Sequence, residues 1–247
     1  MSIFRFKDFA VIHDKSSMKV GVDGVLLGAW VSTCINDTKP VRILDVGCGC
    51  GLISLILTDF LPNSIVDAID IHPGSVVEAT ENFINSPWSE RLNCRLVNFI
   101  DFALDDYNSG KYDIVVSNPP FFNSGVYSPS TPRLQARHQG ELSPTALISN
   151  AEKLLRPNGR LFMIIPAEQL VKIEEACTHN HLTLLKVVRV KGSYNAKPKR
   201  ILTEILLPES PGLNSGSPEE TTLTIRDESG NYSPEYRNLT SRLYLSF

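Results

Sequence analysis

Three glycines at alternate positions constrain the fold of this chain more than any other feature of its sequence. Gly47, Gly49 and Gly51 follow an apolar run over 41–46 that predicts a buried strand, and Leu52–Phe60 then has the pattern of a helix. Because glycine has no Cβ, such a turn lets the backbone approach a ligand closely and lets the helix pack tightly on the strand. This order of elements is typical of a doubly wound α/β sheet, in which the ligand lies at the carboxyl end of the strand.

The rest of the chain alternates short β-rich runs with helical patterns. Candidate strands lie at 65–71, 94–97, 112–117, 160–165, 182–191, 201–207 and 223–227, and candidate helices at 74–85, 144–155 and 166–179. Such alternation implies right-handed crossovers and a mostly parallel sheet. We therefore expect an α/β, Rossmann-like fold with a central, mostly parallel seven-stranded sheet and helices on both faces. Residues 41–247 would form this single domain, with 1–40 as an N-terminal cap segment and 211–220 as a surface loop.

The composition of the 247 residues is that of an ordinary globular enzyme, with 42% hydrophobic and 21% charged residues. The net charge of -3 means that any nucleic-acid contact must be a local basic patch. The five cysteines are odd in number and form no C-x-x-C pair, so we expect neither a disulfide framework nor a metal site. Free thiols favour a cytoplasmic location, and no signal peptide or membrane span is expected.

Acidic residues follow three of the expected strands and indicate the class of ligand. Asp45 starts the glycine turn, where a carboxylate would oppose a pyrophosphate but suits a ligand with ammonium, sulfonium and hydroxyl groups. Asp70 ends the second strand, where it can accept hydrogen bonds from both ribose hydroxyls. Asp101 and Phe102 would bind the adenine amino group and pack on its ring. A single Asp after a strand is usually a turn or cap residue, but three in strand order predict S-adenosylmethionine rather than NAD.

A proline-rich segment, Ser117–Phe122, closes the fourth expected strand. It can be no more than a turn, but a position beside the glycine turn favours a role in the reaction. An exocyclic amine on a base is a poor nucleophile, because its lone pair is delocalised into the ring. The side-chain carbonyl of Asn118 and the backbone carbonyl of Pro119 can accept its two N–H bonds in a fixed geometry that frees the lone pair. Phe121 can stack on the base, so these three residues are the expected catalytic group, with Asn118 also bordering the cofactor.

Basic residues gather in two places that can neutralise phosphates. The segment 186–200 contains no acidic residue, and a second, polar stretch follows the proline-rich segment. Each of them also fits a solvated strand or loop edge that binds nothing. The expected RNA-binding residues are Arg133, Arg137, His138, Lys191, Lys197, Lys199 and Arg200.

Four segments carry a resemblance to a known family: Met18–Trp30, Asn118–Phe122, Gln135–His138 and Asp227–Phe247. Over nearly its full length the chain resembles class I methyltransferases, and more narrowly the bacterial tRNA(Val) adenosine-37 N6-methyltransferase family. The resemblance implies methyl transfer to N6 of adenine in tRNA, with Gly21 and Asp23 over the methionine part of the cofactor. The chain departs from the family at Val22, where a threonine is expected, and at the cysteines of the glycine turn. Both changes are tolerated if the ligand contacts the backbone there rather than the side chains.

The N-P-P-[FY] motif does not by itself fix the substrate, because related enzymes modify guanine N2 in rRNA, adenine in DNA or a glutamine amide in protein. A guanine-N2 rRNA methyltransferase and a protein glutamine N5-methyltransferase therefore stay open as alternatives. A non-catalytic RNA-binding protein is disfavoured by the intact motif at 118–121. The expected partner is a tRNA substrate, with no membrane and no metal ion, and a monomer is favoured.

Overall fold

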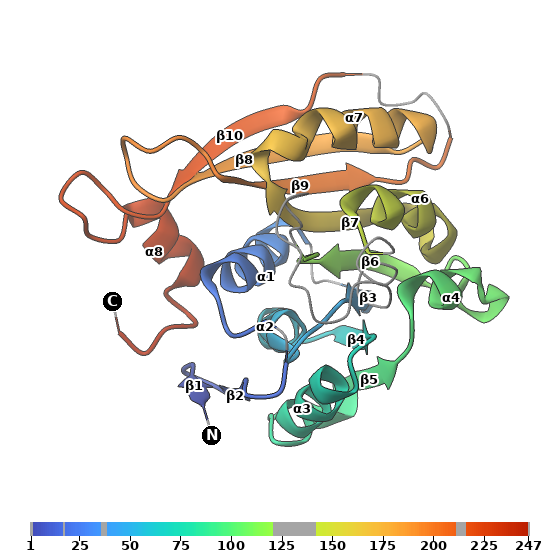
Figure 1. Ribbon diagram of the computed structural model, residues 1–247, viewed down its shortest axis with the longest axis horizontal. Helices are drawn as coiled ribbons and strands as arrows, with labels where there is room; N and C mark the ends of the chain where they lie inside the picture. Colours follow the sequence, from blue (N-terminus) through green and yellow to red (C-terminus); the bar gives the residue numbers. More distant parts are fainter. Residues whose placement is uncertain (1, 17, 36–38, 121–141, 211–215, 247) are drawn as a thin grey trace, which may run out of the picture.

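A sheet of eight strands with helices on both of its faces organises the computed structural model (Figure 1). Its strands, in chain order, are β3 (Val41–Val46), β4 (Ser64–Asp70), β5 (Leu92–Leu96), β6 (Tyr112–Ser117), β7 (Leu155–Pro166), β8 (Thr183–Lys191), β9 (Arg200–Leu206) and β10 (Glu219–Thr224). A separate antiparallel pair precedes them, formed by β1 (Ile3–Arg5) and β2 (Ala10–Ile12). The structure describes residues 2–16, 18–35, 39–120, 142–210 and 216–246.

The helices divide between two hydrophobic cores, one on each face of the sheet. They are α1 (Val22–Cys34), α2 (Leu52–Phe60), α3 (Pro73–Ile84), α4 (Phe99–Leu104), α6 (Pro144–Leu154), α7 (Leu170–His179) and α8 (Pro234–Thr240). Helices α1, α2, α3 and α8 contribute to the core of one face, and α4, α6 and α7 contribute to the core of the other. Short 3₁₀ turns at Ser89–Arg91, Asp106–Asn108 and Ala167–Gln169 complete the connections.

The central strands are apolar on both sides, which explains why they read as continuous hydrophobic runs. Successive side chains of a strand point to opposite faces. Ile43 of β3 therefore packs into the core with α1 and α2, whereas Leu44 packs into the core with α4 and α6. In β7, Phe162 and Leu161 are divided between the two cores in the same way.

The order of the strands predicts a crevice at the carboxyl ends of the central strands. The order is β10-β8-β9-β7-β6-β3-β4-β5, and β9 alone among these eight runs against the others. After β3 the chain builds β4 and β5 on one side and then returns to place β6 on the other side. Ligands in open α/β sheets bind beyond the carboxyl ends of the strands at such a reversal.

The expected number of seven strands is corrected to eight by β10, which pairs in parallel with β8 at the edge of the sheet. The sequence placed a strand at 223–227 and a loop over 211–220, but β10 spans Glu219–Thr224. Its residues are mostly exposed, so it needs no apolar run to form. Hydrophobic patterning therefore missed the start of the strand.

Most other expected elements lie where the pattern placed them. α2 has the predicted bounds, and α3 begins at Pro73, one residue earlier than expected. α6 follows the expected cap, because the Ser143 side chain accepts a hydrogen bond from the backbone N–H of Ala146 at 3.1 Å. β7 starts at Leu155 rather than at residue 160, and the pairing is irregular between Tyr112 and Ile114 of β6.

The N-terminal 40 residues share a core with the rest of the chain. Phe6 and Val25 are buried in the same cluster as Ile43. The backbone N–H of Lys7 also donates to the carbonyl of Leu243 at 2.9 Å, which joins the N-terminal and C-terminal segments of the chain. Among the described residues, no helix has the length and apolar character needed to cross a membrane.

Candidate active site

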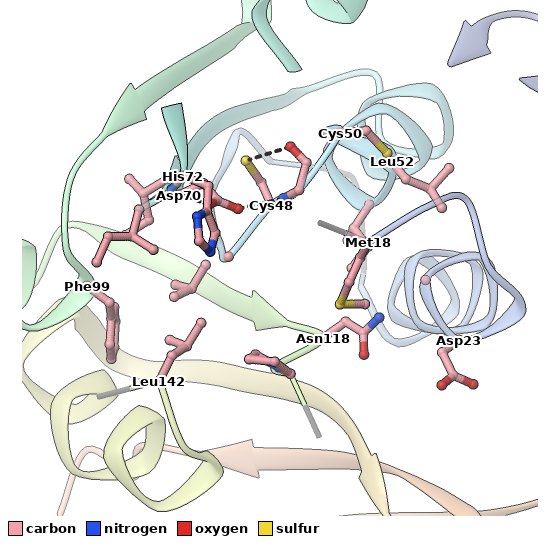
Figure 2. Close-up of a pocket in the computed structure, with 18 of the residues that line it drawn as sticks. Met18, Asp23, Cys48, Cys50, Leu52, Asp70, His72, Phe99, Asn118 and Leu142 are labelled. Atoms are coloured by element: carbon pink, nitrogen blue, oxygen red, sulfur yellow. Dashed lines mark hydrogen bonds between the residues drawn. The ribbon is translucent and has the colours of Figure 1, made fainter. Parts of the chain in front are cut away.

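A cavity of about 760 Å³ lies in the crevice at the carboxyl ends of β3, β4, β5 and β6 (Figure 2). Its walls come from the segment that leads into α1, from the glycine turn after β3, and from the ends of β4, β5 and β6, with Leu142 closing one side. The volume is within the range of pockets that hold a small molecule of cofactor size. The lining is mostly apolar, with a few polar groups among which Asp70, His72 and Asn118 are prominent (Figure 2).

The glycine turn forms one wall of the cavity, and its three glycines serve two different purposes. Gly47 and Gly49 line the cavity, so the backbone itself faces the ligand. Gly51 faces away, and a Cβ there would lie 2.4 Å from the ring of Phe83. All three have positive φ, between 56° and 81°, which other residues rarely adopt. Gly51 is therefore needed for packing against α3, not for contact with a ligand.

Asp70 is one of the two acidic residues in the described lining of the cavity, and its carboxylate is already held in place. Oδ2 accepts a hydrogen bond from the backbone N–H of Gly49 at 2.9 Å, and Oδ1 accepts one from that of His72 at 2.8 Å. These bonds tie the end of β4 to the glycine turn. The side chain is almost fully buried, so a ribose hydroxyl that reached it would meet a fixed acceptor.

Asp45 lies beneath the turn and not in the cavity lining, which corrects its expected contact with the ligand. Its Oδ2 accepts hydrogen bonds from the Ser54 hydroxyl at 2.6 Å and from the Ser54 backbone N–H at 3.1 Å. Ser54 is in the first turn of α2, so the carboxyl group satisfies a free N–H at the start of that helix. Complete burial raises the pKa of Asp45 to about 7, against the lowering effect of the Ser54 hydrogen bonds. Asp45 supports the shape of the turn.

Asp101 and Phe102 also lie outside the cavity lining, and their expected places are taken by Asn98 and Phe99. The reason is the start of α4, which begins at Phe99 with Asn98 as its cap, accepting from the backbone N–H of Ile100 at 2.7 Å. In this helix Asp101 faces solvent and Phe102 is buried in the core of that face. The sequence analysis expected the contacts after this strand but did not predict the short helix.

Asn118 follows the last residue of β6 and points into the cavity opposite the glycine turn (Figure 2). It is only 7% exposed, and its buried Oδ1 has no hydrogen-bond partner among the described residues. A buried acceptor without a partner costs free energy, which a ligand that donates an N–H would recover. The hydroxyl of Ser117 donates to the carbonyl of Val46 at 2.8 Å and fixes the end of β6 beside β3.

The remaining residues of the proline-rich segment are only partly described. Pro120 lines the cavity, and Pro119 is buried between it and Asn118. Phe121 lies outside the described residues, so its expected stacking role stays a prediction. Gly21 and Asp23, at the start of α1, both line the cavity, and their expected place over the methionine part of the cofactor stays a prediction. Sequence reasoning missed several further lining residues, of which Met18, Lys19, His72, Asn98, Phe99 and Leu142 are examples.

Some of the basic residues of 186–200 are paired with acids that are distant in the sequence. Lys186 lies 3.8 Å from carboxylate oxygens of both Glu204 and Glu219, and Arg189 Nε lies 2.9 Å from Glu220. The strands on either side of β8, which are β9 and the edge strand β10, bring these acids to it. The positive charge of Lys186 and Arg189 is therefore neutralised within the sheet.

Four of the expected RNA-binding residues are in the described part of the chain. The Lys191 ammonium donates to the carbonyl of Tyr194 and lies 5.7 Å from the centre of its ring. Arg200 Nε donates to Asp23 Oδ2 at 3.0 Å, so the connection from β8 to β9 lies beside the cavity wall. Lys197 and Lys199, on the same connection, are exposed. The other three expected residues, Arg133, Arg137 and His138, lie outside the described residues.

The donor and acceptor groups of the cavity fit an adenosyl ligand that carries positive charge. Asp70 supplies a fixed carboxylate, the glycine turn supplies backbone without side chains, and Phe99 with Ile69 supplies apolar walls. No cluster of three or more His, Cys, Asp or Glu side chains that could hold a metal ion occurs in the described ranges. All five cysteines are free thiols.

Comparisons with known proteins agree with this geometry. The family model of the methyltransferase small domain matches residues 29–195. Among solved structures, a predicted O-methyltransferase from Agrobacterium tumefaciens has a TM-score of 0.65 at 15% identity, covering 92% of this chain and 99% of its own. A methyltransferase from Pyrococcus furiosus has a TM-score of 0.53 at 16% identity, covering 74% of this chain and 83% of its own. At these identities the likeness shows the fold, which is the Rossmann-like fold of class I methyltransferases.

Curated relatives match the chain over almost its entire length. A tRNA1(Val) (adenine(37)-N6)-methyltransferase from Parabacteroides distasonis is 38% identical over 242 residues, which are 98% of this chain and 97% of the relative. The protein of the same name from Flavobacterium psychrophilum is 38% identical over 243 residues, with coverage of 98% and 99%. The chain therefore belongs to the tRNA1(Val) (adenine(37)-N6)-methyltransferase family.

Proposed function

We propose that the protein transfers a methyl group from S-adenosylmethionine to N6 of adenine 37 in the anticodon loop of a valine tRNA. The names of its full-length relatives support this substrate. The structural observation that carries the proposal is the Oδ1 atom of Asn118, which is buried at the wall of the cavity opposite the glycine turn and has no hydrogen-bond partner in the part of the chain that the structure describes. An acceptor without a donor at this place suits a substrate that brings N–H bonds, as an exocyclic amine does.

The cofactor would lie along the glycine turn. Asp70 would accept hydrogen bonds from the ribose, Phe99 would pack on the adenine, and Gly21 with Asp23 would border the methionine part. When bound, S-adenosylmethionine supplies an electrophilic methyl group on a sulfonium that is a good leaving group. Gly51 and Asp45 would act only through the shape of the turn.

The side chains at the end of β6 would orient the amine of the target base. Asn118 Oδ1 would accept one of its N–H bonds and the carbonyl of Pro119 the other, while Phe121 would stack on the base. An asparagine side chain cannot take a proton at neutral pH, so Asn118 would not act as a base. It would instead fix the direction of the lone pair on the amine nitrogen of the target base. Burial of Asn118 excludes water from this acceptor, which strengthens the hydrogen bond.

The RNA would approach over the connection between β8 and β9. Lys197 and Lys199 are exposed there, and the ion pair between Arg200 and Asp23 holds this connection beside the cavity. Arg133, Arg137 and His138 would add contacts close to the target base. Lys191 and Arg200 already have partners within the protein, so their contribution to phosphate binding would be smaller.

Nucleoside mass spectrometry tests the proposed reaction. The protein is incubated with labelled S-adenosylmethionine and with two transcripts of the valine tRNA, one of them carrying guanine in place of adenine 37. We expect labelled N6-methyladenosine from the first transcript and no label from the second. An adenine-37 transcript without label, or label found on guanosine or on protein instead, would refute the proposal.

We also propose that the protein is a single domain that acts as a monomer in the cytoplasm. The shared core of the N-terminal segment and the sheet supports one domain. Sedimentation at increasing protein concentration tests the monomer, with and without tRNA, because a dimer would show a concentration-dependent mass.

A further inference from the structure

Residues 12–16, which we name the N-terminal strap, are fixed to α3 by one buried carboxylate. Glu78 Oε1 accepts hydrogen bonds from the backbone N–H groups of Asp14 at 2.6 Å and Lys15 at 2.8 Å. Glu78 Oε2 accepts one from the backbone N–H of Ser16 at 2.9 Å. Three consecutive N–H groups of the strap therefore converge on a single side chain.

The burial of Glu78 shows that the strap and the carboxylate depend on each other. The side chain is only 1% exposed, and a buried charge is costly unless it is hydrogen-bonded. Burial acts to raise the pKa of Glu78, but the hydrogen bonds from the strap outweigh it and hold the pKa below its usual range. A glutamine in the same place would have one acceptor oxygen instead of two, and its amide group would face an N–H of the strap.

Asn82, one turn further along α3, joins the strap to the glycine turn. Its Oδ1 accepts from the backbone N–H of Ile12 at 2.8 Å, and its Nδ2 donates to the carbonyl of Ile12 at 2.9 Å. The same Nδ2 donates to the carbonyl of Cys50 at 2.8 Å. Cys50 lines the cavity, so one amide group fixes the strap and a wall of the cavity relative to each other.

The strap leads directly into a second wall of the cavity. The hydroxyl of Ser16 donates to the carbonyl of Met18 at 2.9 Å, and Met18 and Lys19 line the cavity. Figure 2 shows Met18 between the glycine turn and Asn118. In contrast, α3 itself contributes no residue to the cavity lining among the described residues.

We propose that Glu78 and Asn82 are positioning residues that set the cofactor affinity by holding the N-terminal strap against the glycine turn. They act through the strap and through Cys50, without touching the ligand. When the strap is released for part of the time, the apparent dissociation constant rises in proportion to the loss of the competent state. The inference deepens the proposed function, because it assumes only that this cavity binds the cofactor and does not depend on the tRNA substrate.

Calorimetric titration with S-adenosylhomocysteine, combined with amide hydrogen exchange, tests the proposal on the full chain. In Glu78→Gln we expect faster exchange at 12–19 and a dissociation constant raised by about tenfold or more, because bonds to a charged acceptor are lost. Glu78→Asp keeps the charge and should recover part of the affinity. Glu81→Gln is the matched control, since Glu81 lies on the same helix and is partly exposed, and it should bind as the wild type does.

The result that overturns the proposal is an unchanged affinity in Glu78→Gln, whether or not the strap exchanges faster. An equal loss of affinity in Glu81→Gln would also overturn it, since the effect would then belong to the helix as a whole. If tRNA methylation is absent but the titration behaves as expected, only the substrate assignment fails.

A second variant decides the question if Glu78→Gln does not fold. Ser16→Ala removes the hydroxyl that links the strap to Met18 and leaves α3 intact. We expect a rise of a few-fold in the dissociation constant of S-adenosylhomocysteine, at an unchanged melting temperature. A dissociation constant equal to that of the wild type would show that the strap does not influence the cofactor site.

Discussion

Two regions of the molecule differ in how their polar groups are paired. The first, which we name the cofactor edge, consists of the glycine turn, Asp70 and Asn118 at the carboxyl ends of the strands. The second, which we name the basic edge, consists of residues 186–200. At the cofactor edge, Asp70 accepts hydrogen bonds from backbone N–H groups, and the Asn118 Oδ1 atom has no partner among the residues that the structure describes. At the basic edge, cations such as Lys186 are paired with acids from neighbouring strands. At the cofactor edge, an acceptor stays available to a ligand. At the basic edge, the paired charges join neighbouring strands.

This difference has a consequence for function. Groups fixed by the backbone can be aligned with a reacting atom before it arrives, which is the basis of preorganisation. Charges that are already paired gain less from a phosphate, because the existing pair must first be broken. We therefore expect substitutions at the cofactor edge to have the larger effects on catalysis.

Replacement of Asn118 gives the largest expected effect. In Asn118→Ala the rate of turnover should fall by roughly 10²- to 10³-fold, as when one preorganised group is removed from an active site, while S-adenosylhomocysteine still binds. Single-turnover kinetics and calorimetry measure the two quantities. Asn108→Ala is the matched control, because Asn108 is also buried with an unpartnered Oδ1 but lies away from the cavity. Normal turnover in Asn118→Ala would refute its role.

Replacement of Asp70 should mainly change cofactor affinity. Asp70→Ala removes the acceptor that we assign to the ribose and releases the N–H of Gly49, so we expect cofactor affinity to fall by about ten- to a hundredfold. Asp67→Ala on the same strand is the control, because Asp67 binds Arg42 and Tyr112 and does not line the cavity. It should lower the free energy of unfolding by about 1–3 kcal/mol and leave affinity unchanged. Equal losses of affinity in both variants would contradict the distinction.

The features that the sequence predicted correctly are those whose causes are local. The glycine turn, the Asp70 position and the bounds of α2 each follow from a few consecutive residues, and the structure places them as expected. The same holds for Asn118, which directly follows a buried strand. The family resemblance added Gly21 and Asp23, which no pattern of composition or periodicity would have selected.

The features that were missed depend on register or on residues that are distant in the sequence. The short helix α4, which the sequence analysis did not predict, places Asn98 in the cavity lining and Asp101 outside it. The segment 186–200 contains no acid, so its pairing with Glu204 and Glu220 was invisible without the order of the strands. Hydrophobic patterning carries no information about such pairs across strands.

The basic edge can be tested by comparing its exposed and paired cations. Reversal of charge in Lys197→Glu/Lys199→Glu should raise the Michaelis constant for tRNA by about tenfold at low salt and reduce the slope of log affinity against log salt by about two. Lys186→Glu/Arg189→Glu changes the charge equally but in the paired cluster. It should lower the melting temperature and have the smaller effect on tRNA binding. If the paired cluster has the larger effect on tRNA, the RNA surface has been assigned to the wrong part of this edge.

The smallest effect is expected at Asp101, where the sequence and the structure disagree. Asp101 is exposed and its side chain lies outside the cavity lining, so Asp101→Ala should change the affinity for S-adenosylhomocysteine by less than about twofold, as for other surface substitutions. Phe99→Ala removes an apolar wall of the cavity and should weaken binding by about tenfold or more, because a buried aromatic side chain is lost. Calorimetry on both variants compares them directly. A tenfold loss in Asp101→Ala would mean that α4 unwinds at its start when the cofactor binds, because only a later helix start would bring that carboxylate to the adenine.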